Sequence, residues 1–497
     1  MITIVINRQE YAYDTFAMIS SFYPGVEIRQ LTSQDEEECI DADLLEIVME
    51  AEKAAVYIAV GEHFHKELHI QRELPSDQEE CKKFWKREFY DILVKYTERT
   101  LPWGNLTGIR PTKLMMSMMQ RTASELEKAL DDESVITSVQ EQLYETHRVG
   151  EKKARLGMQI ASLEHHILEP YTNSQGYSIY IGIPFCPSTC LYCSFTSNPI
   201  VKWKNQIENY LHALQFEIQY TAKLMGKKHL DTVYIGGGTP TTLTPEELRI
   251  LLHAVNTYLP MHETTEFTVE AGRADSITRE KLQVLMEYGV NRISVNPQTM
   301  KDETLRIIGR HHTVQEFLDA YALTREVGFQ NINMDIILGL PGETLRDVED
   351  TLKQITQLSP DSLTVHSLAI KRASKMKGWM QEHDHLPTMD YEKAMMAAAN
   401  AAECMNMLPY YLYRQKNMAG NLENTGYARN GQYGIYNILI MEEVQSIVAL
   451  GAGSVSKRVF GDGRIERCDN VKDVSLYLER IDEMLERKRQ LFEEDTK

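Results

Sequence analysis

The stretch YIGIPFCPSTCLYCSF, Tyr180–Phe195, decides the fold. It places three cysteines, Cys186, Cys190 and Cys193, in the spacing C-x3-C-x2-C. The apolar run Ser178–Ile183 before them is typical of a buried strand, and a proline then turns the chain into a loop. We therefore expect three thiolates on one loop at the exit of a strand, an arrangement that suits a soft metal centre.

An iron–sulfur cube is normally held by four cysteine ligands. Three thiolates would leave one iron open, which is the pattern of enzymes that bind S-adenosylmethionine (SAM) on a [4Fe–4S] cluster. The alternative is zinc, which usually takes four ligands, often in two C-x2-C pairs. This chain has no second pair and no histidine inside the loop, so Cys404 or His366 would have to complete a zinc site from elsewhere. The pattern favours the iron–sulfur centre.

The bulk composition bounds the remaining possibilities. A length of 497 residues predicts two or three domains, and the net charge of −19 makes nucleic acid a poor partner. No apolar run is long enough for a membrane span, and the first residues lack the pattern of a signal peptide, so we expect a cytoplasmic protein. Seven cysteines, four of them scattered, do not indicate a disulfide framework.

The middle of the chain alternates short apolar runs with amphipathic segments. The six apolar runs are residues 177–183, 232–236, 266–271, 292–298, 331–338 and 362–368. Six such βα units predict a parallel sheet covered by helices, with its site at the carboxyl ends of the strands. The predicted fold class is α/β, a partial (β/α)6 barrel over residues 171–370. We expect an N-terminal α+β domain over residues 1–170 and a C-terminal α+β domain over 371–497 that covers the active site.

The N-terminal region carries its own strand and helix patterns. Strands are predicted at residues 2–6, 26–31 and 54–60, and helices at 9–22 and 76–96, the second capped by Ser76. The loop that follows, residues 101–114, can be read in two ways. It is either a packed connector with Trp103 in the core, or an anion site that uses Arg110 and Lys113.

Polar or glycine residues follow each predicted strand. GGGTPT, residues 236–241, follows the second strand, and its glycines would let the backbone approach a ligand closely. Glu270, Gln298 and Asp335 lie on or after the next three strands, and Arg310 follows a short helix. Each residue alone is more often a surface or capping group. At equivalent barrel positions, however, we expect them to form a ring around an adenosine and a carboxylate.

These motifs together resemble the radical SAM superfamily, and within it the oxygen-independent coproporphyrinogen III oxidases (coproporphyrinogen dehydrogenases). The matching motifs are YxxIPFCxxxCxxC (180–193), GGGTPT (236–241), NRISVNPQ (291–298), GRHHT (309–313), INMDIILGLPGET (332–344), SLTVHSLA (362–369) and LGAGSVS (450–456). Residues 1–170 resemble the N-terminal extension of the HemZ-like variant of this family.

The resemblance implies a role for individual residues. Cys186, Cys190 and Cys193 would ligate a [4Fe–4S] cluster, and Tyr180 would be a catalytic residue that lines the SAM site. The other expected SAM contacts are Tyr192, Gly237, Gly238, Thr239, Glu270, Gln298, Arg310 and Asp335, with Ala369 and Val455 closing over the adenine or a second SAM. One or two SAM molecules would bind.

The resemblance also implies a reaction in haem biosynthesis. A 5′-deoxyadenosyl radical formed from SAM would abstract a hydrogen from a propionate of coproporphyrinogen III. Loss of CO2 and an electron would leave a vinyl group, twice over, giving protoporphyrinogen IX. The expected partners are this tetrapyrrole and an electron donor such as flavodoxin or ferredoxin. Lys371, Arg372 and Arg414 are candidate propionate contacts, although a solvated basic turn is the alternative for the first two.

Two positions depart from the oxidase pattern. Gly182 stands where the best-known oxidase type has histidine, and Ser194 and Phe195 replace a segment that carries a fourth cysteine. In this respect CLYCSF resembles the haem-chaperone branch. Two alternatives to the oxidase therefore stay open: a haem-binding chaperone on the same fold, and a radical SAM methyltransferase that opens haem anaerobically.

Overall fold

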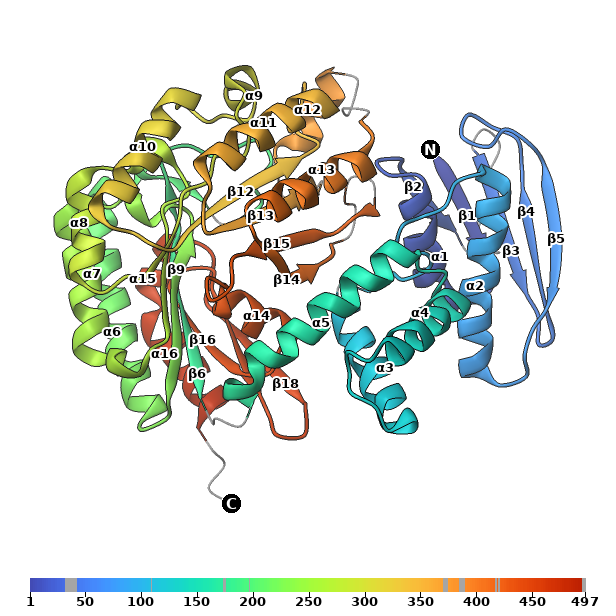
Figure 1. The fold of residues 1–497 in the computed structure, drawn as a ribbon, viewed down its shortest axis with the longest axis horizontal. Helices are drawn as coiled ribbons and strands as arrows, with labels where there is room; N and C mark the ends of the chain where they lie inside the picture. The colour runs from blue at the N-terminus through green and yellow to red at the C-terminus, as the bar shows by residue number, and fades with distance from the viewer. Residues whose placement is uncertain are drawn as a thin grey trace. The chain divides into compact units, whose positions relative to one another are not determined.

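The computed structural model forms two compact units. It describes residues 1–31, 43–108, 110–172, 176–195, 197–369, 374–383, 389–415, 418 and 421–493. The first unit comprises Met1–Ser162 and Tyr413–Glu423, and the second comprises Leu163–Leu412 and Asn424–Lys497. Each unit has its own sheet, and each is coloured by residue number in Figure 1.

The first unit is built on a five-stranded sheet in the order β2-β1-β3-β4-β5. Its strands are β1 (Ile2–Ile6), β2 (Ile28–Leu31), β3 (Asp43–Met49), β4 (Lys53–Ile58) and β5 (Leu68–Glu73). Strand β1 runs parallel to both of its neighbours, β2 and β3. Strand β4 runs antiparallel to its neighbours, β3 and β5. The sequence predicted β1, β2 and β4 but missed β3 and β5.

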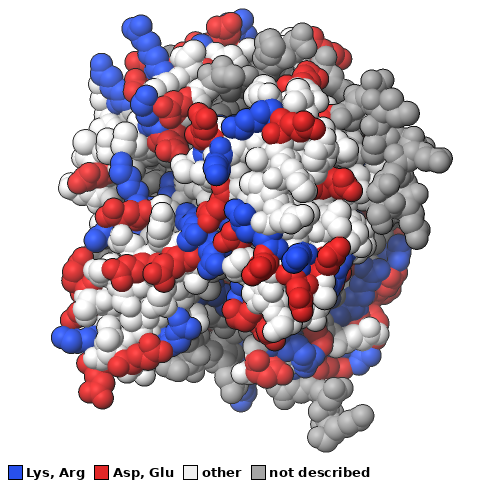
Figure 2. Space-filling model, turned by 90° about the vertical axis from the view of Figure 1, so that its right-hand side faces the viewer, with Lys and Arg blue, Asp and Glu red and all other residues white. Residues whose placement is uncertain are grey.

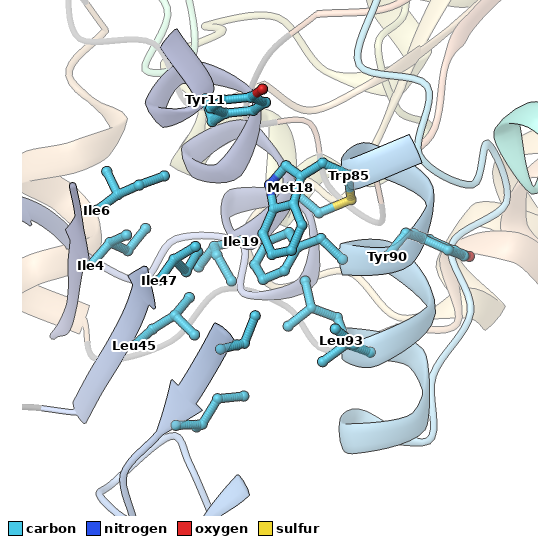
Figure 3. Packing of buried hydrophobic residues seen from close by; sticks show 14 of the residues in the cluster. Ile4, Ile6, Tyr11, Met18, Ile19, Leu45, Ile47, Trp85, Tyr90 and Leu93 are labelled. Atoms are coloured by element: carbon cyan, nitrogen blue, oxygen red, sulfur yellow. The ribbon is translucent and has the colours of Figure 1, made fainter. Parts of the chain in front are cut away.

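Helices α1 (Gln9–Phe22) and α2 (Gln78–Thr97) cover this sheet. Isoleucine and leucine side chains from β1 and β3 meet Met18 and Ile19 of α1 and Trp85 and Leu93 of α2 (Figure 3). Helix α2 is capped by Asp77, whose side chain accepts a hydrogen bond from the backbone of Glu80. The predicted cap at Ser76 was therefore wrong by one residue, a common error at helix ends.

Three further helices follow in the chain, of which the last continues past Ser162 into the second unit, and residues 413–423 belong to the first unit. The helices are α3 (Pro111–Leu126), α4 (Glu133–His147) and α5 (Glu151–Thr172). Trp103 is fully buried and donates a hydrogen bond of 2.7 Å to Glu423, which also pairs with Lys153. The packed-connector interpretation of the loop at Trp103 is thereby confirmed.

The second unit is organised by six parallel strands that pair in sequence order. They are β6 (Tyr177–Ile183), β9 (Leu230–Gly237), β10 (Glu266–Glu270), β11 (Arg292–Ser294), β12 (Ile332–Leu338) and β13 (Ser362–Ser367). The register is parallel at every step from β6 to β13. All six strands match the predicted βα units, and all their carboxyl ends therefore lie along one edge.

Helices between these strands cover the outer face of the sheet, and α6, α7, α8 and α10 form one layer in Figure 1. Their bounds are α6 (Ile207–Met225), α7 (Pro245–Tyr258), α8 (Arg279–Glu287), α9 (Asp302–Ile307), α10 (Val314–Val327) and α11 (Leu345–Leu358). Thr244, Thr313 and Thr344 each begin a helix with a complete capping box. The predicted helix start at Thr244 is confirmed.

Strands from the C-terminal region extend both ends of the same sheet. Strand β16 (Ser446–Leu450) runs parallel beside β6, followed by antiparallel β17 (Val455–Val459) and β18 (Ile465–Asp469). At the other end, β15 (Asn424–Ala428) pairs with β13, and β14 (Leu408–Tyr413) forms the edge. The remaining helices are α12 (Met376–His383), α13 (Tyr391–Cys404), α14 (Ile435–Glu442), α15 (Val474–Glu479) and α16 (Ile481–Phe492).

The result is an 11-stranded sheet whose edge strands β14 and β18 do not pair with each other. The predicted fold class, a partial barrel of α/β type, is therefore confirmed. The predicted domain boundaries at residues 170 and 370 stay predictions.

Charges of both signs are interspersed on the face shown in Figure 2. Among the described residues, no helix is both long and apolar enough to cross a membrane.

Candidate functional site

The cysteine loop leaves β6 at the carboxyl edge of the sheet. Its first residues form the short strand β7 (Phe185–Cys186), which pairs with β8 (Asn198–Pro199) so that Cys186 lies beside Pro199. A backbone hydrogen bond of 3.2 Å from Cys193 to Cys190 closes the turn between these two cysteines. Cys190 is buried, and the other two are partly exposed. The fold thus presents all three cysteines where a barrel of this type carries its site.

The triple glycine at the end of β9, residues 236–238, holds that loop in place. The backbone N–H of Gly238 donates to the carbonyl of Ile183 at 2.8 Å, and Thr239 donates to Phe185 at 2.7 Å. A Cβ at residue 238 would lie 2.5 Å from the carbonyl oxygen of Phe185, and Gly237 has φ +107°. Only glycine fits such a close approach and such a backbone angle. These N–H groups thus fix the cysteine loop; the predicted SAM contacts of 237–239 stay a prediction.

Two side chains donate hydrogen bonds toward the cysteine sulfurs. Thr239 Oγ1 lies 3.5 Å from Cys186 Sγ, and Arg273 Nη1 lies 3.5 Å from Cys190 Sγ. Burial raises the pKa of the Cys186 thiol to about 11. A coordinating metal would reverse this effect, because it deprotonates a bound thiol outright.

The three cysteines are the candidate ligands of a metal centre. Within the described part of the chain, no three His, Cys, Asp or Glu side chains gather closely enough to hold one metal ion. A zinc ion needs all its ligands about 2.3 Å or less from one point. A [4Fe–4S] cube instead gives each thiolate its own iron, so its ligands are spread more widely. Three cysteines on one loop are a donor set compatible with a cluster of this kind.

Glu270 ends β10 inside the barrel. Burial raises the pKa of its carboxyl group to about 7, although hydrogen bonds from Tyr234 and the backbone of Gly237 oppose this rise. The rings of Tyr180, Tyr234 and Tyr436 stack beside it, with the Tyr234 and Tyr436 centroids 4.6 Å apart. The carboxyl group therefore sits in an aromatic, weakly hydrated setting in which its charge state can change near neutral pH.

Asp335 on β12 has a pKa that is shifted in the opposite direction from that of Glu270. Burial would raise its pKa, but hydrogen bonds, first among them the one with His366, hold it below its ordinary value. Asn333 and Asn296 donate to its two oxygens at 2.7 and 2.8 Å, and His366 Nε2 lies 3.8 Å away. Asp335 is thus ionised and held rigidly in the barrel.

Gln298 and Arg310 carry buried polar atoms without a hydrogen-bond partner among the described residues, Oε1 and Nε respectively. Gln298 also has φ +65°, an unfavourable angle for this residue type. Arg310 is otherwise engaged, since it donates to the carbonyls of Gly272 and Asn296 and to the Tyr192 hydroxyl. Buried unpaired atoms and a strained backbone are typical of ligand sites.

Several members of this group were missed from sequence. Asn296, Tyr234, Tyr436 and Arg273 contact the predicted residues, yet none was singled out. Asn296 was the most accessible to prediction, because it lies two residues before Gln298 and therefore on the same face of an extended segment. Tyr436 was the least accessible, because it comes from α14, far along the chain.

Other predicted residues lie apart from this group or outside the described residues. Val455 is 47% exposed at the start of β17, and Ala369 is partly exposed just after β13; their contacts with SAM stay predictions. Arg414 is buried within the first unit, where it donates to the carbonyl of Leu106, so it does not present a free cation to a propionate. Lys371 and Arg372 lie outside the described residues.

Gly182 is explained by packing. A Cβ at residue 182 would lie 3.2 Å from the carbonyl oxygen of Leu450, and one at Gly451 would lie 2.4 Å from the carbonyl oxygen of Gly182. The hydroxyl of Tyr210 donates to the same Gly182 oxygen at 2.7 Å. The turn after β16 thus presses against β6 where the oxidase pattern has histidine.

Comparisons with known proteins agree with this geometry. A model of the radical SAM superfamily matches residues 180–355. The oxygen-independent coproporphyrinogen-III oxidase-like protein HemZ of Bacillus subtilis is 41% identical over 82% of this chain and 81% of its own length. The heme chaperone HemW of the same organism is 38% identical over 44% of this chain and 57% of its own length.

A solved structure shares the fold. Coproporphyrinogen III oxidase (HemN) from Escherichia coli, described as a radical SAM enzyme, superposes with a TM-score of 0.50 at 22% sequence identity. The match covers 65% of this chain and 73% of the oxidase chain.

Proposed function

The chain belongs to the radical SAM family that contains the coproporphyrinogen-III oxidase-like protein HemZ, and from this premise we propose that it is an oxidoreductase acting on coproporphyrinogen III. The observation that carries the proposal is the run of neighbouring strands that brings together the cysteine loop after β6, Glu270 at the end of β10, Gln298 beyond β11 and Asp335 on β12. A [4Fe–4S] cluster with SAM supplies a carbon radical that can remove a hydrogen atom from an unreactive position.

The residues of the chain have distinct tasks in this proposal. Cys186, Cys190 and Cys193 hold the cluster, and the backbone of Gly238 and Thr239 fixes the loop that carries them. The carboxylates of Glu270 and Asp335 receive the polar groups of SAM.

Buried atoms without a protein partner complete the SAM site in the proposal. Gln298 Oε1 would accept a hydrogen bond from SAM, which would relieve its lack of a partner among the described residues. The stacked rings of Tyr180, Tyr234 and Tyr436 keep water out of the barrel interior next to the SAM site.

The proposed reaction converts two propionates into vinyl groups. For each, a hydrogen atom leaves the β-carbon, the carboxylate leaves as CO2, and one electron passes to an external one-electron acceptor. An external one-electron donor such as flavodoxin or ferredoxin is required for each turnover. The product would be protoporphyrinogen IX.

The test is anaerobic incubation of the reconstituted protein with SAM, a reductant and coproporphyrinogen III. We expect tricarboxylate and dicarboxylate products together with 5′-deoxyadenosine, and none from a Cys190→Ala variant. Formation of 5′-deoxyadenosine without a changed porphyrinogen would refute the substrate while leaving the cofactor assignment in place.

A haem chaperone is the second candidate, because Ser194 and Phe195 follow the third cysteine as in that branch. A chaperone would bind haem tightly and leave the porphyrinogen unchanged. Titration of the same preparation with haem, followed by its absorption spectrum, distinguishes the two. The appearance of S-adenosylhomocysteine and a methylated tetrapyrrole would instead support the methyltransferase alternative.

A further inference from the structure

Arg273 lies between β10 and the 3-10 turn Ala274–Ser276, and only 3% of it is exposed. Its Nη1 donates to Cys190 Sγ at 3.5 Å and to Ser188 Oγ at 3.2 Å. The opposite edge of the guanidinium is paired with Asp275, through Nε at 3.0 Å and Nη2 at 2.7 Å. This two-point pairing fixes the plane of the group, so that the remaining nitrogen is held against the cysteine loop.

We propose that Arg273 is a positioning residue that raises the reduction potential of the cluster held by Cys190. Hydrogen bonds to the sulfurs and the net charge nearby are among the factors that set the potential of an iron–sulfur cluster. Reduction adds one negative charge. A buried cation that donates to a ligand sulfur stabilises that charge, and the low polarity of the surroundings strengthens the effect.

The donor to Cys190 differs in kind from the donor to Cys186. Cys186 receives a hydrogen bond from the neutral hydroxyl of Thr239, whereas the guanidinium of Arg273 carries a full positive charge. A hydrogen bond from an ionised donor is roughly twice as strong as one between neutral groups. The effect on potential should therefore come mainly from Arg273.

The surrounding charges modify this effect without removing it. Asp275 partly offsets the cation but sits on the side of the guanidinium away from Nη1. Arg310 adds a second buried cation whose nitrogens are directed to two carbonyls and to Tyr192. His312 Nδ1 lies 4.0 Å from Asp275, and burial lowers its pKa to about 4, so it is neutral.

The inference rests on the proposed function only in requiring a cluster on the three cysteines; it does not depend on the tetrapyrrole. The experiment is an anaerobic redox titration of the full reconstituted chain, monitored by electron paramagnetic resonance, with iron and sulfide quantified in each sample. The variants are Arg273→Gln, Arg273→Lys and Asp275→Asn. The matched control is Arg279→Gln, which removes an exposed arginine paired with Glu326 at 2.7 Å.

We expect Arg273→Gln to lower the midpoint potential. At the wild-type midpoint, the ratio of reduced to oxidised cluster should fall about tenfold, which for a one-electron couple is about 59 mV. Arg273→Lys, which keeps the charge, should shift it less. Asp275→Asn, which removes the offsetting charge, should shift the potential upward, and Arg279→Gln should leave it unchanged.

An Arg273→Gln protein with wild-type iron content and wild-type potential would overturn the inference. If the Arg273→Gln variant loses its cluster, Asp275→Asn becomes the test. A midpoint potential that does not rise in Asp275→Asn would equally overturn the inference. A wild-type protein that assembles no cluster would instead refute the proposed function. A wild-type cluster that is inactive toward coproporphyrinogen III leaves the potential measurement, and hence this inference, fully testable.

Discussion

Two buried polar clusters in the second unit differ in how completely their hydrogen bonds are satisfied. Glu217 on α6 accepts four hydrogen bonds, from Gly451, Asn470, Tyr477 and Lys488, at 2.6 to 2.8 Å. At the carboxyl edge of the sheet, by contrast, Gln298 Oε1 and Arg310 Nε have no partner among the described residues.

This difference distinguishes a network that stabilises the fold from a site that can bind a ligand. A carboxylate offers about four acceptor positions, and at Glu217 all of them are used, so no capacity is left for a ligand. That network ties the C-terminal helix α16 to the turn at Gly451, which in turn lies against Gly182 on β6. The unsatisfied atoms at Gln298 and Arg310 indicate a ligand site, because burying a polar atom without a hydrogen-bond partner is costly unless a ligand supplies one.

The largest effect that the comparison predicts is at the site. Cys190→Ala should abolish assembly of a stable [4Fe–4S] cluster, because two thiolates cannot replace three in holding it. Iron and sulfide content after anaerobic reconstitution measure the loss. The matched control is Cys404→Ala, an exposed cysteine, which should retain the wild-type content. Equal cluster content in both variants would contradict the assignment of the loop.

The next effect concerns the satisfied network. Lys488→Met should lower the free energy of unfolding by about 3–5 kcal/mol, because it leaves the Glu217 carboxylate buried without its counter-ion. The pair is fully buried at 2.6 Å. Midpoints of denaturant unfolding measure the change, and adding Glu217→Gln should recover part of it. Arg480→Met, which breaks an exposed pair with Glu483, is the control and should change stability little.

A smaller effect should appear in the pH dependence of SAM binding. The Glu270 carboxyl, with a pKa of about 7, is largely protonated at pH 6 and ionised at pH 8. SAM is cationic at its sulfonium and ammonium groups, so its affinity should rise as the pH increases through 7 and then level off, by about tenfold in total.

The groups that face Glu270 are Tyr234, Tyr180, Tyr436 and Asp335, all of which keep one charge state over this range. Isothermal titration at pH 6 and pH 8 gives the ratio of affinities. Glu270→Gln should bind SAM weakly and lose the rise in affinity between these two pH values, leaving only the change due to the titration of SAM's own amino group. If Glu270→Gln keeps the wild-type pH profile, a group other than Glu270 is responsible for the pH dependence of SAM binding.

The smallest effect is on stability at Gln298, where the cost of the backbone angle can be measured separately from the loss of SAM binding. Its φ of +65° costs a non-glycine residue roughly 1–2 kcal/mol. Gln298→Gly should therefore be more stable than Gln298→Ala by about 1 kcal/mol in thermal or denaturant unfolding. Both variants should bind SAM more weakly than the wild type, since both lack the amide. Equal stability of the two variants would mean that the backbone angle is not strained.

Much of this site was predictable because its residues follow the strands of a repeating pattern. The C-x3-C-x2-C loop follows β6, the glycines end β9, Glu270 ends β10, Gln298 lies beyond β11, and Asp335 lies within β12. Strand periodicity and the parallel βα order then place them at one edge. In the first unit, β1, α1 and α2 were likewise found from local patterns, whereas β3 and β5, which lie at either end of an antiparallel run, were missed.

The sequence by itself determined the fold and the candidate metal-binding loop, because strand order and cysteine spacing are local properties of the chain. Only the tertiary structure decided which distant groups meet around that loop and around the sheet that carries it. Arg273 reaches Cys190 across 83 residues, Lys488 reaches Glu217 across 271, and Tyr436 enters the barrel from α14. Such contacts depend on packing between elements far apart in the chain, and no periodicity in the sequence records them.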